Sequence, residues 1–120
     1  MSSTPALDDM LGAAQGSLGA MHRAQVRRDP WPDFAAFERE RYPAELRRAA
    51  AVQWAGRARA EYGSVHQFSQ VAHALASARV ALPLLGGLSR LVTDEVRHAE
   101  LCAAMALACD PEASEHTRRF

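Results

Sequence analysis

The sequence contains no lysine, only two cysteines and no long hydrophobic run. Its fourteen basic residues are all arginine and balance fourteen acidic residues, so the formal net charge is zero. A neutral chain lacks the basic surface of a nucleic-acid-binding protein and the polybasic segment that binds anionic membranes. Every hydrophobic segment is shorter than the roughly eighteen residues that a membrane-spanning helix needs. We therefore expect a protein that binds neither nucleic acid nor membrane.

The two cysteines, Cys102 and Cys109, indicate the compartment. They lie on one predicted helix, about 10 Å apart along its axis, which is too far for a disulfide bond between them. Reduced thiols are typical of a cytosolic protein. The N-terminal segment MSSTPALDDMLGAAQG contains acidic residues and no continuous apolar stretch, so we expect no signal peptide. A cytoplasmic location is the simplest interpretation.

Hydrophobic spacing predicts an all-α fold in one globular domain of 120 residues, of which 48% are hydrophobic and 23% charged. Residues 1–43 would form an N-terminal helical extension. It would contain a helix from about Leu7 to Arg27 and a short helix from Phe34 to about Arg41. Asp33 is placed to cap the short helix, and two prolines separate it from the preceding helix.

Two longer helices would follow as an antiparallel hairpin over residues 44–109. The first is expected from about Ala44 to Ala78, roughly 50 Å long at 1.5 Å per residue. The second would begin between Pro83 and Leu88, because two adjacent glycines weaken the helix there, and would end before Asp110-Pro111. We interpret residues 110–120 as a C-terminal tail.

Each long helix carries an apolar stripe with alternating steps of three and four residues, the pattern of a helix packed in an antiparallel bundle. The stripe of the first helix comprises Val52, Trp54, Ala55, Ala58, Val65, Phe68, Ala72 and Leu75. The stripe of the second comprises Leu88, Leu91, Val92, Ala99, Cys102, Met105 and Ala106. The ionisable residues within these stripes are Glu61 on the first helix and Glu95 and His98 on the second.

These three residues are the candidate functional site. Glu95 and His98 are three residues apart, so their side chains leave the same face of a helix. A buried carboxylate is costly unless it is paired or ligates a metal. Glu61 lies about seventeen residues before the predicted turn and Glu95 about twelve after it, so folding back could bring them to nearly the same level. One metal would then bind Glu61 and His98 terminally and Glu95 as a bridge, and these donors suit iron or manganese.

The neighbours of the pair strengthen this interpretation. Asp94 could accept a hydrogen bond from a metal-bound histidine of a facing motif, and Arg97 could hold Asp94 by an ion pair. The string Asp94-Glu95-Val96-Arg97-His98 resembles the D-E-x-R-H signature of the ferritin-like superfamily. The segment ARAEYGSVHQF around Glu61 is similar to the first ligand helix of bacterial ferritin-like domains. The resemblance implies a di-iron site with Glu61, Glu95 and His98 as ligands, and with Asp94 and Arg97 supporting them.

The sequence departs from this family in one large respect. The full family pattern has a second Glu and a second Glu-x-x-His on two further helices, and the rest of the chain contains no such motif. The chain would therefore form half of a four-helix bundle and supply three of six ligands. Either a homodimer completes the site, as in encapsulated ferritins, or a C-terminal half-bundle is missing. A twofold axis would bring two identical half-sites together.

Three functions remain open at this point. The first is an oxygen-activating oxidoreductase that uses two iron ions per complete site, with dioxygen or peroxide as the oxidant. The second is a ferroxidase that oxidises iron for storage. The third is a metal-free helical interaction module, in which the buried Glu and His fix the pairing of helices. We interpret Cys102, Trp54 and Tyr62 as packing residues, and His66 and His73 as residues outside the site.

Overall fold

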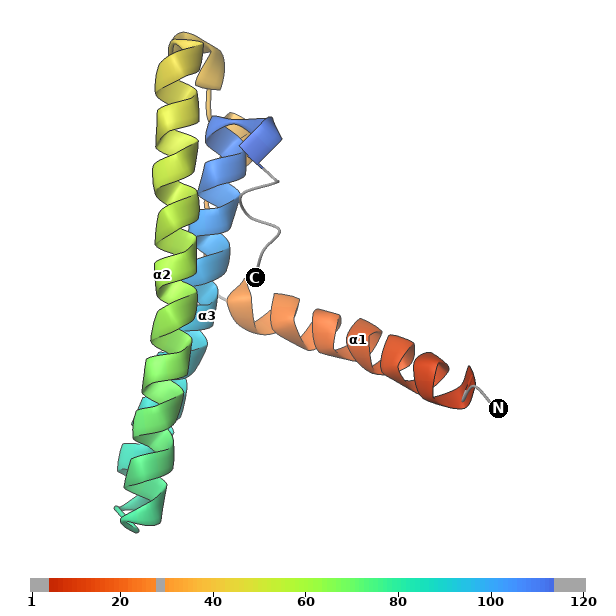
Figure 1. Cartoon of the computed structure of the whole chain (residues 1–120), viewed down its shortest axis with the longest axis vertical. Coiled ribbons are helices and arrows are strands. Elements are labelled where there is room, and N and C mark those ends of the chain that lie inside the picture. The colour runs from red at the N-terminus through yellow and green to blue at the C-terminus, as the bar shows by residue number, and fades with distance from the viewer. Residues whose placement is uncertain (1–4, 28–29, 114–120) are drawn as a thin grey trace. The chain divides into compact units, whose positions relative to one another are not determined.

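The computed structural model describes the backbone of residues 5–27 and 30–113, and the side chains of residues 16–27 and 30–112. All regular elements within these ranges are helices or 3-10 turns, and these ranges contain no strand (Figure 1). The elements in order are α1 (Pro5–Val26), the 3-10 turns η1 (Phe34–Ala36) and η2 (Arg39–Arg41), the long helices α2 (Ala44–Ser77) and α3 (Leu82–Cys109), and the 3-10 turn η3 (Pro111–Ala113). The all-α prediction is confirmed.

The chain divides into two compact units. The first contains α1 and ends at Trp31, over whose ring the Arg27 guanidinium lies at 5.5 Å. The second begins at Pro32 and contains the 3-10 turns and the two long helices. The candidate site belongs entirely to the second unit.

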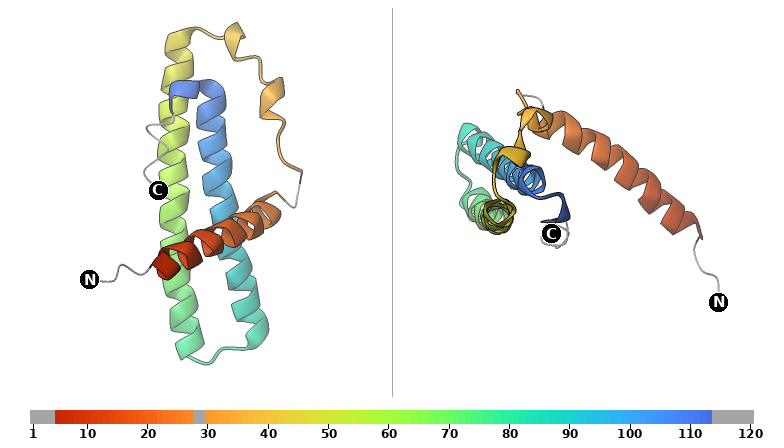
Figure 2. Two further views of the ribbon diagram at one scale, coloured as in Figure 1. Left: turned by 90° about the vertical axis from the view of Figure 1, so that its right-hand side faces the viewer. Right: turned by 90° about the horizontal axis from the view of Figure 1, so that it is seen from above.

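Helices α2 and α3 form the antiparallel hairpin that the sequence predicts (Figures 1 and 2). The turn between them uses Arg79, which adopts a left-handed backbone with φ of 56°. Pro83 lies in the first turn of α3, where its missing N–H leaves no hydrogen bond unmade. Helix α3 begins at Leu82, one residue before the earliest start that the sequence predicts, and it includes Gly86 and Gly87. Packing of a long apolar face outweighs the helix propensity of two residues.

The core of the hairpin is made of small side chains. Ala51, Ala55 and Ala58 of α2 are at most 2% exposed, and the buried residues of α3 are Leu88, Cys102, Ala106 and Cys109. Two stripe assignments are wrong: Val52 is 52% exposed and Leu91 is 45% exposed. Both side chains therefore lie outside the contact between α2 and α3 that buries Ala51, Ala55 and Leu88.

Residues 32–43, the first part of the second unit, run along the hairpin and are called the strap below (Figure 2). The predicted helix from Phe34 to Arg41 is instead two 3-10 turns, η1 and η2, separated by extended backbone at Phe37. Asp33 caps η1 as predicted, because its carboxylate accepts a hydrogen bond from the backbone N–H of Ala35 at 3.1 Å. Phe37 stacks on Tyr42 and packs against the buried residues Ala51 and Cys109. The strap thus covers the end of the hairpin farthest from its turn.

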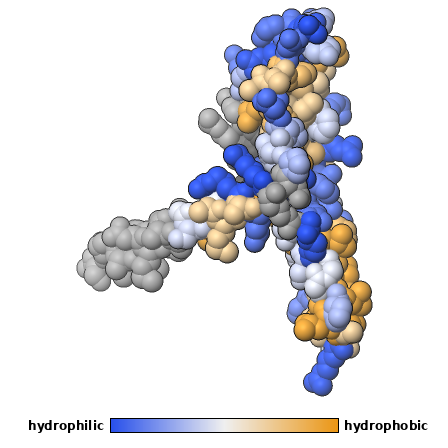
Figure 3. All heavy atoms as spheres, turned by 180° about the vertical axis from the view of Figure 1, so that it is seen from behind, coloured by the Kyte–Doolittle hydropathy of each residue, from blue (hydrophilic) through white to orange (hydrophobic). Residues whose placement is uncertain are grey.

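Apolar side chains remain uncovered at the turn end of the hairpin (Figure 3). Leu82, Leu84 and Val71 are 78%, 54% and 47% exposed. Among the described residues, no helix is both long and apolar enough to cross a lipid bilayer.

Candidate metal centre

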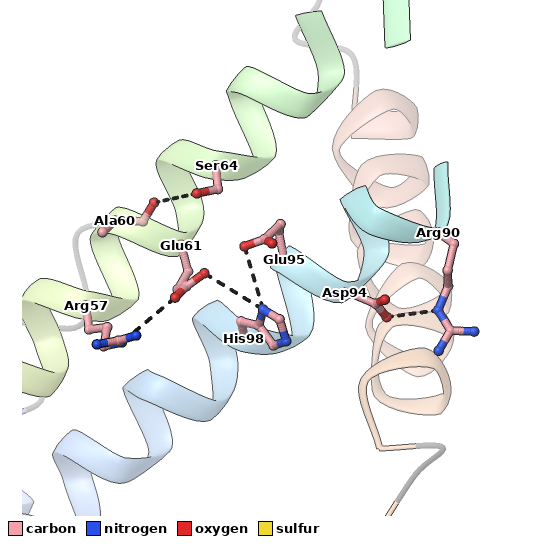
Figure 4. A network of polar contacts seen from close by, with 8 residues as sticks. All are labelled: Arg57, Ala60, Glu61, Ser64, Arg90, Asp94, Glu95 and His98. Atoms are coloured by element: carbon pink, nitrogen blue, oxygen red, sulfur yellow. Dashed lines mark hydrogen bonds and ion pairs between the residues drawn. The ribbon is translucent and has the colours of Figure 1, made fainter. Parts of the chain in front are cut away.

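Glu61, Glu95 and His98 come together at mid-height of the hairpin (Figure 4). Glu61 points from α2 toward α3, and Glu95 and His98 are one turn apart on α3 and point back. One potential ligand atom from each residue lies within 4.8 Å of the others. Antiparallel packing of two long helices places the three residues at one level, as their spacing from the turn predicts.

The imidazole of His98 lies between the two carboxylates. Its Nδ1 atom is 3.8 Å from Oε2 of Glu61 and 3.7 Å from Oε2 of Glu95. Both distances are longer than a hydrogen bond but short enough for one ion to bind all three groups after small rotations of the side chains. The cluster therefore presents two carboxylates and one imidazole around a common point.

The three side chains differ in burial. Glu95 is the deepest, with 15% of its side chain exposed; Glu61 is 22% exposed and His98 is 47% exposed. The prediction that both residues of the Glu-x-x-His pair enter the core holds for Glu95, whereas His98 lies at the rim. The cluster is therefore closed toward the hairpin core and open toward the outside, which is the side where further ligands would bind.

The environment of Glu95 favours its protonated form. A hydrogen bond with Glu61, burial, and the negative charge of Glu61 all raise the pKa of Glu95, while His98 opposes the shift. Two carboxylates this close share a proton more readily than they carry two charges. A cation placed between them would displace that proton, which makes binding of a metal pH-dependent.

Two arginines flank the cluster. Nε of Arg57, one turn before Glu61 on α2, is 4.0 Å from Oε1 of Glu61, an i,i+4 pair that the sequence analysis overlooked. Asp94 accepts a hydrogen bond from Nε of Arg90 at 2.9 Å. The Asp94–Arg97 contact that the sequence suggests stays a prediction, as does a contact between Asp94 and a facing histidine.

A hollow of about 640 Å³ opens beside the cluster. Glu61, His98 and Cys102 form one wall; the other lining residues are Pro32, Phe34, Trp54, Arg57, Leu101 and Met105. The contribution of the strap residues was not predicted, since nothing in the local sequence shows on which helix the strap packs. Apart from Arg57, Glu61 and His98, the lining side chains carry no charge.

The remaining candidate residues lie where the sequence predicts. Cys102 is buried, and burial together with the nearby charge of Glu61 raises the pKa of its thiol. His66 and His73 are exposed and do not belong to the cluster. Trp54 is half-buried beside the core, whereas Tyr62 is 55% exposed and does not pack as expected.

No protein-family model matches this chain, and comparisons with curated proteins and with solved structures give no match. The interpretation of the cluster therefore depends on its chemistry and geometry. Two carboxylates and one imidazole are a donor set for iron, manganese or zinc, and the absence of thiolate donors favours iron or manganese. The residues present fit the metal that the sequence resemblance implies.

Proposed function

We propose that this chain carries half of a ferritin-like dinuclear metal site and acts as an oxygen-activating oxidoreductase. The observation that carries the proposal is the convergence of Glu61, Glu95 and His98 from two helices on one point. Glu61 and His98 would bind the same metal ion as terminal ligands. Glu95, the deepest of the three, would bridge this ion and a second one. Iron in such a site supplies the electrons that reduce dioxygen or peroxide.

The chain's own groups have defined tasks in this proposal. A bound cation would favour the charged form of Glu95, whose pKa Glu61 and burial raise, and Arg57 would supply a positive charge 4.0 Å from Glu61. The core side of the cluster excludes water, because Ala58 and Cys102 are buried there. The single histidine at the rim leaves the outer side open for the oxidant and for the missing ligands.

The surroundings of the cluster favour oxygen activation over iron storage. Among the residues that line the hollow, Glu61 is the only carboxylate. A ferroxidase needs an acidic path along which iron ions move, and the hollow offers apolar walls instead. Free thiols at Cys102 and Cys109 agree with a cytoplasmic location.

An anaerobic titration with Fe(II) tests the proposal. We expect one iron per chain in the wild type, and consumption of dioxygen when air is admitted. Glu61→Gln and His98→Gln should each lower the bound iron at least tenfold while the helical circular dichroism stays unchanged. His66→Gln, on the same helix as Glu61 but outside the cluster, is the matched control and should bind iron normally. Unchanged iron content in both cluster variants would overturn the proposal.

One observation favours a second function, a metal-free helical interaction module. Nδ1 of His98 lies within 3.8 Å of a carboxylate oxygen of both glutamates, and polar clusters in the seam between helices can specify how the helices pair. This alternative predicts that thermal stability does not change when chelators are added or when Fe(II) or Mn(II) is supplied. A rise in melting temperature with either metal would exclude it.

A further inference from the structure

The hollow beside the cluster has apolar walls and one guanidinium at its edge. Resting on the proposed function, which supplies the metal, we propose that this hollow binds the substrate, and that the substrate is a small apolar monocarboxylate. Its carboxylate binds Arg57, and its apolar body lies between the strap and the two long helices.

Three elements enclose the hollow and give it its apolar character. Trp54 belongs to α2, Leu101 and Met105 belong to α3, and Phe34 belongs to the strap. All four side chains are half-buried, so each leaves apolar surface exposed in the hollow. The volume of about 640 Å³ is within the range of roughly 300–1,000 Å³ that is typical of small-molecule sites. The hollow is therefore large enough for an organic molecule and mostly complementary to an apolar one.

Arg57 supplies the polar contact that would orient the ligand. Among the residues that line the hollow, it is the only one with a permanent positive charge. Its Nε lies 4.0 Å from Oε1 of Glu61, too far for a hydrogen bond, and Glu61 is its sole ion-pair partner within the described part of the chain (Figure 4). The side chain is 68% exposed, so its N–H groups remain able to donate to a ligand. A guanidinium binds a carboxylate through two parallel hydrogen bonds.

The charges of the proposed site favour an anionic ligand. A divalent cation bound between Glu61 and Glu95 would compensate both carboxylates, and Arg57 would then have no counter-charge among the residues that line the hollow. A monocarboxylate restores neutrality, whereas a cationic ligand would add to the positive charge. A single arginine between apolar walls thus matches a ligand with one carboxylate and an apolar remainder.

The position of Arg57 also sets the orientation of the ligand. Trp54 lies three residues before Arg57 on α2, so the two side chains leave the same side of the helix. A carboxylate held by Arg57 places the ligand's apolar atoms against Trp54. Because Arg57 lies beside Glu61, the carbon atoms next to the carboxylate are the ones nearest the cluster.

Equilibrium dialysis of the full, metal-free chain against naphthalene-2-carboxylate and naphthalene-2-carboxamide tests the charge requirement, because the two probes have the same ring system and differ in charge. We expect the carboxylate to bind at least fivefold more tightly than the amide. Arg57→Gln should reduce this preference to less than twofold. Arg48→Gln, which removes an exposed arginine of the same helix outside the hollow, is the matched control and should retain it. Both variants should keep the helical circular dichroism of the wild type. Equal affinities in the wild type, or a preference that survives Arg57→Gln, would overturn the proposal.

Methionine methyl signals locate the bound probe. Met105 lines the hollow, and the other three methionines of the chain lie within residues 1–31. In a chain labelled with ¹³C at the methionine methyl groups, naphthalene-2-carboxylate should shift the Met105 signal through its ring current and leave the other three unchanged. The Met105→Leu variant assigns the signal by its loss. Saturation with the probe without a shift of the Met105 signal would place the probe elsewhere and overturn the site.

Failure of this inference and failure of the proposed function give different results. A chain that binds iron but not naphthalene-2-carboxylate would refute the substrate class and leave the metal site standing. A chain that binds the probe through Arg57 but binds no metal would refute the proposed function and leave a binding site for small apolar acids.

Discussion

Replacing Glu95 by glutamine should stabilise the metal-free protein while it abolishes metal binding. In the metal-free state Glu95 faces the carboxylate of Glu61, and its raised pKa shows that the charged form is disfavoured there. An amide keeps the shape of the side chain, removes one charge and can donate a hydrogen bond to Glu61. Residues that serve a site often reduce the stability of the fold, and the proposed site predicts this behaviour for Glu61 and Glu95.

The size of the effect follows from the geometry. One oxygen of Glu61 and one of Glu95 lie within 4.8 Å of each other, and two unit charges at that limit repel by about 3.5 kcal/mol at an effective dielectric constant of 20. Partial exposure of both side chains and the shared proton reduce this value, so we expect a gain of about 1–2 kcal/mol at pH 8. For a chain of this length that gain raises the melting temperature by roughly 4 °C or more.

Urea denaturation of the metal-free protein, followed by circular dichroism at pH 8, measures the change. Glu45→Gln is the matched control: Glu45 is exposed in the first turn of α2, where its charge stabilises the helix. This control should lose about 0.3–1 kcal/mol, the opposite sign. If Glu95→Gln is as unstable as the control or less stable, the two carboxylates do not repel in the folded state and the reasoning fails.

Three further predictions concern pH, thiols and the turn. The folded state holds the proton of Glu95 more tightly than the unfolded chain, so the metal-free protein should lose stability as pH rises from 4.5 through the raised pKa. Metal affinity should rise over the same pH range. Urea denaturation at several pH values checks the fall in stability, and metal titrations at the same pH values check the rise in affinity. Burial raises the pKa of the Cys102 and Cys109 thiols, so at pH 8 both should react with a thiol reagent at least tenfold more slowly in the native protein than in guanidinium chloride. Arg79→Gly should stabilise the hairpin by up to about 1 kcal/mol in urea denaturation, because glycine adopts the positive φ of this turn without strain.

The sequence predicts most of the fold because its signals are strong. The apolar stripes extend over many helical turns, and Pro43 and Asp110-Pro111 mark the helix ends within one or two residues. The convergence of Glu61 with Glu95 follows from counting residues to the turn. The 3-10 turns of the strap, and the exposure of Val52 and Leu91, depend on tertiary packing, which local propensity does not predict.

The surroundings of the site are less predictable than the ligands. The exposure of His98 and the hollow beside it depend on where the strap packs, and no periodicity in residues 32–43 indicates that position. The ion pair of Asp94 with Arg90 was missed because two arginines lie within reach of Asp94, Arg90 four residues before it and Arg97 three residues after it. Which of them binds is decided by rotamers and not by spacing alone.

The three buried alanines of α2 affect how the proposed site can change. Ala51, Ala55 and Ala58 are almost fully buried between α2 and α3, so the volume of these side chains sets the separation of the two helices. Glu61 lies one turn beyond Ala58, and it faces donors on the other helix. Adding or removing a methyl group at one of these alanines would therefore change the distance between Glu61 on α2 and the two donors on α3 by a fraction of an ångström. Metal preference could then be adjusted from a distance, without replacing any residue that binds the ion.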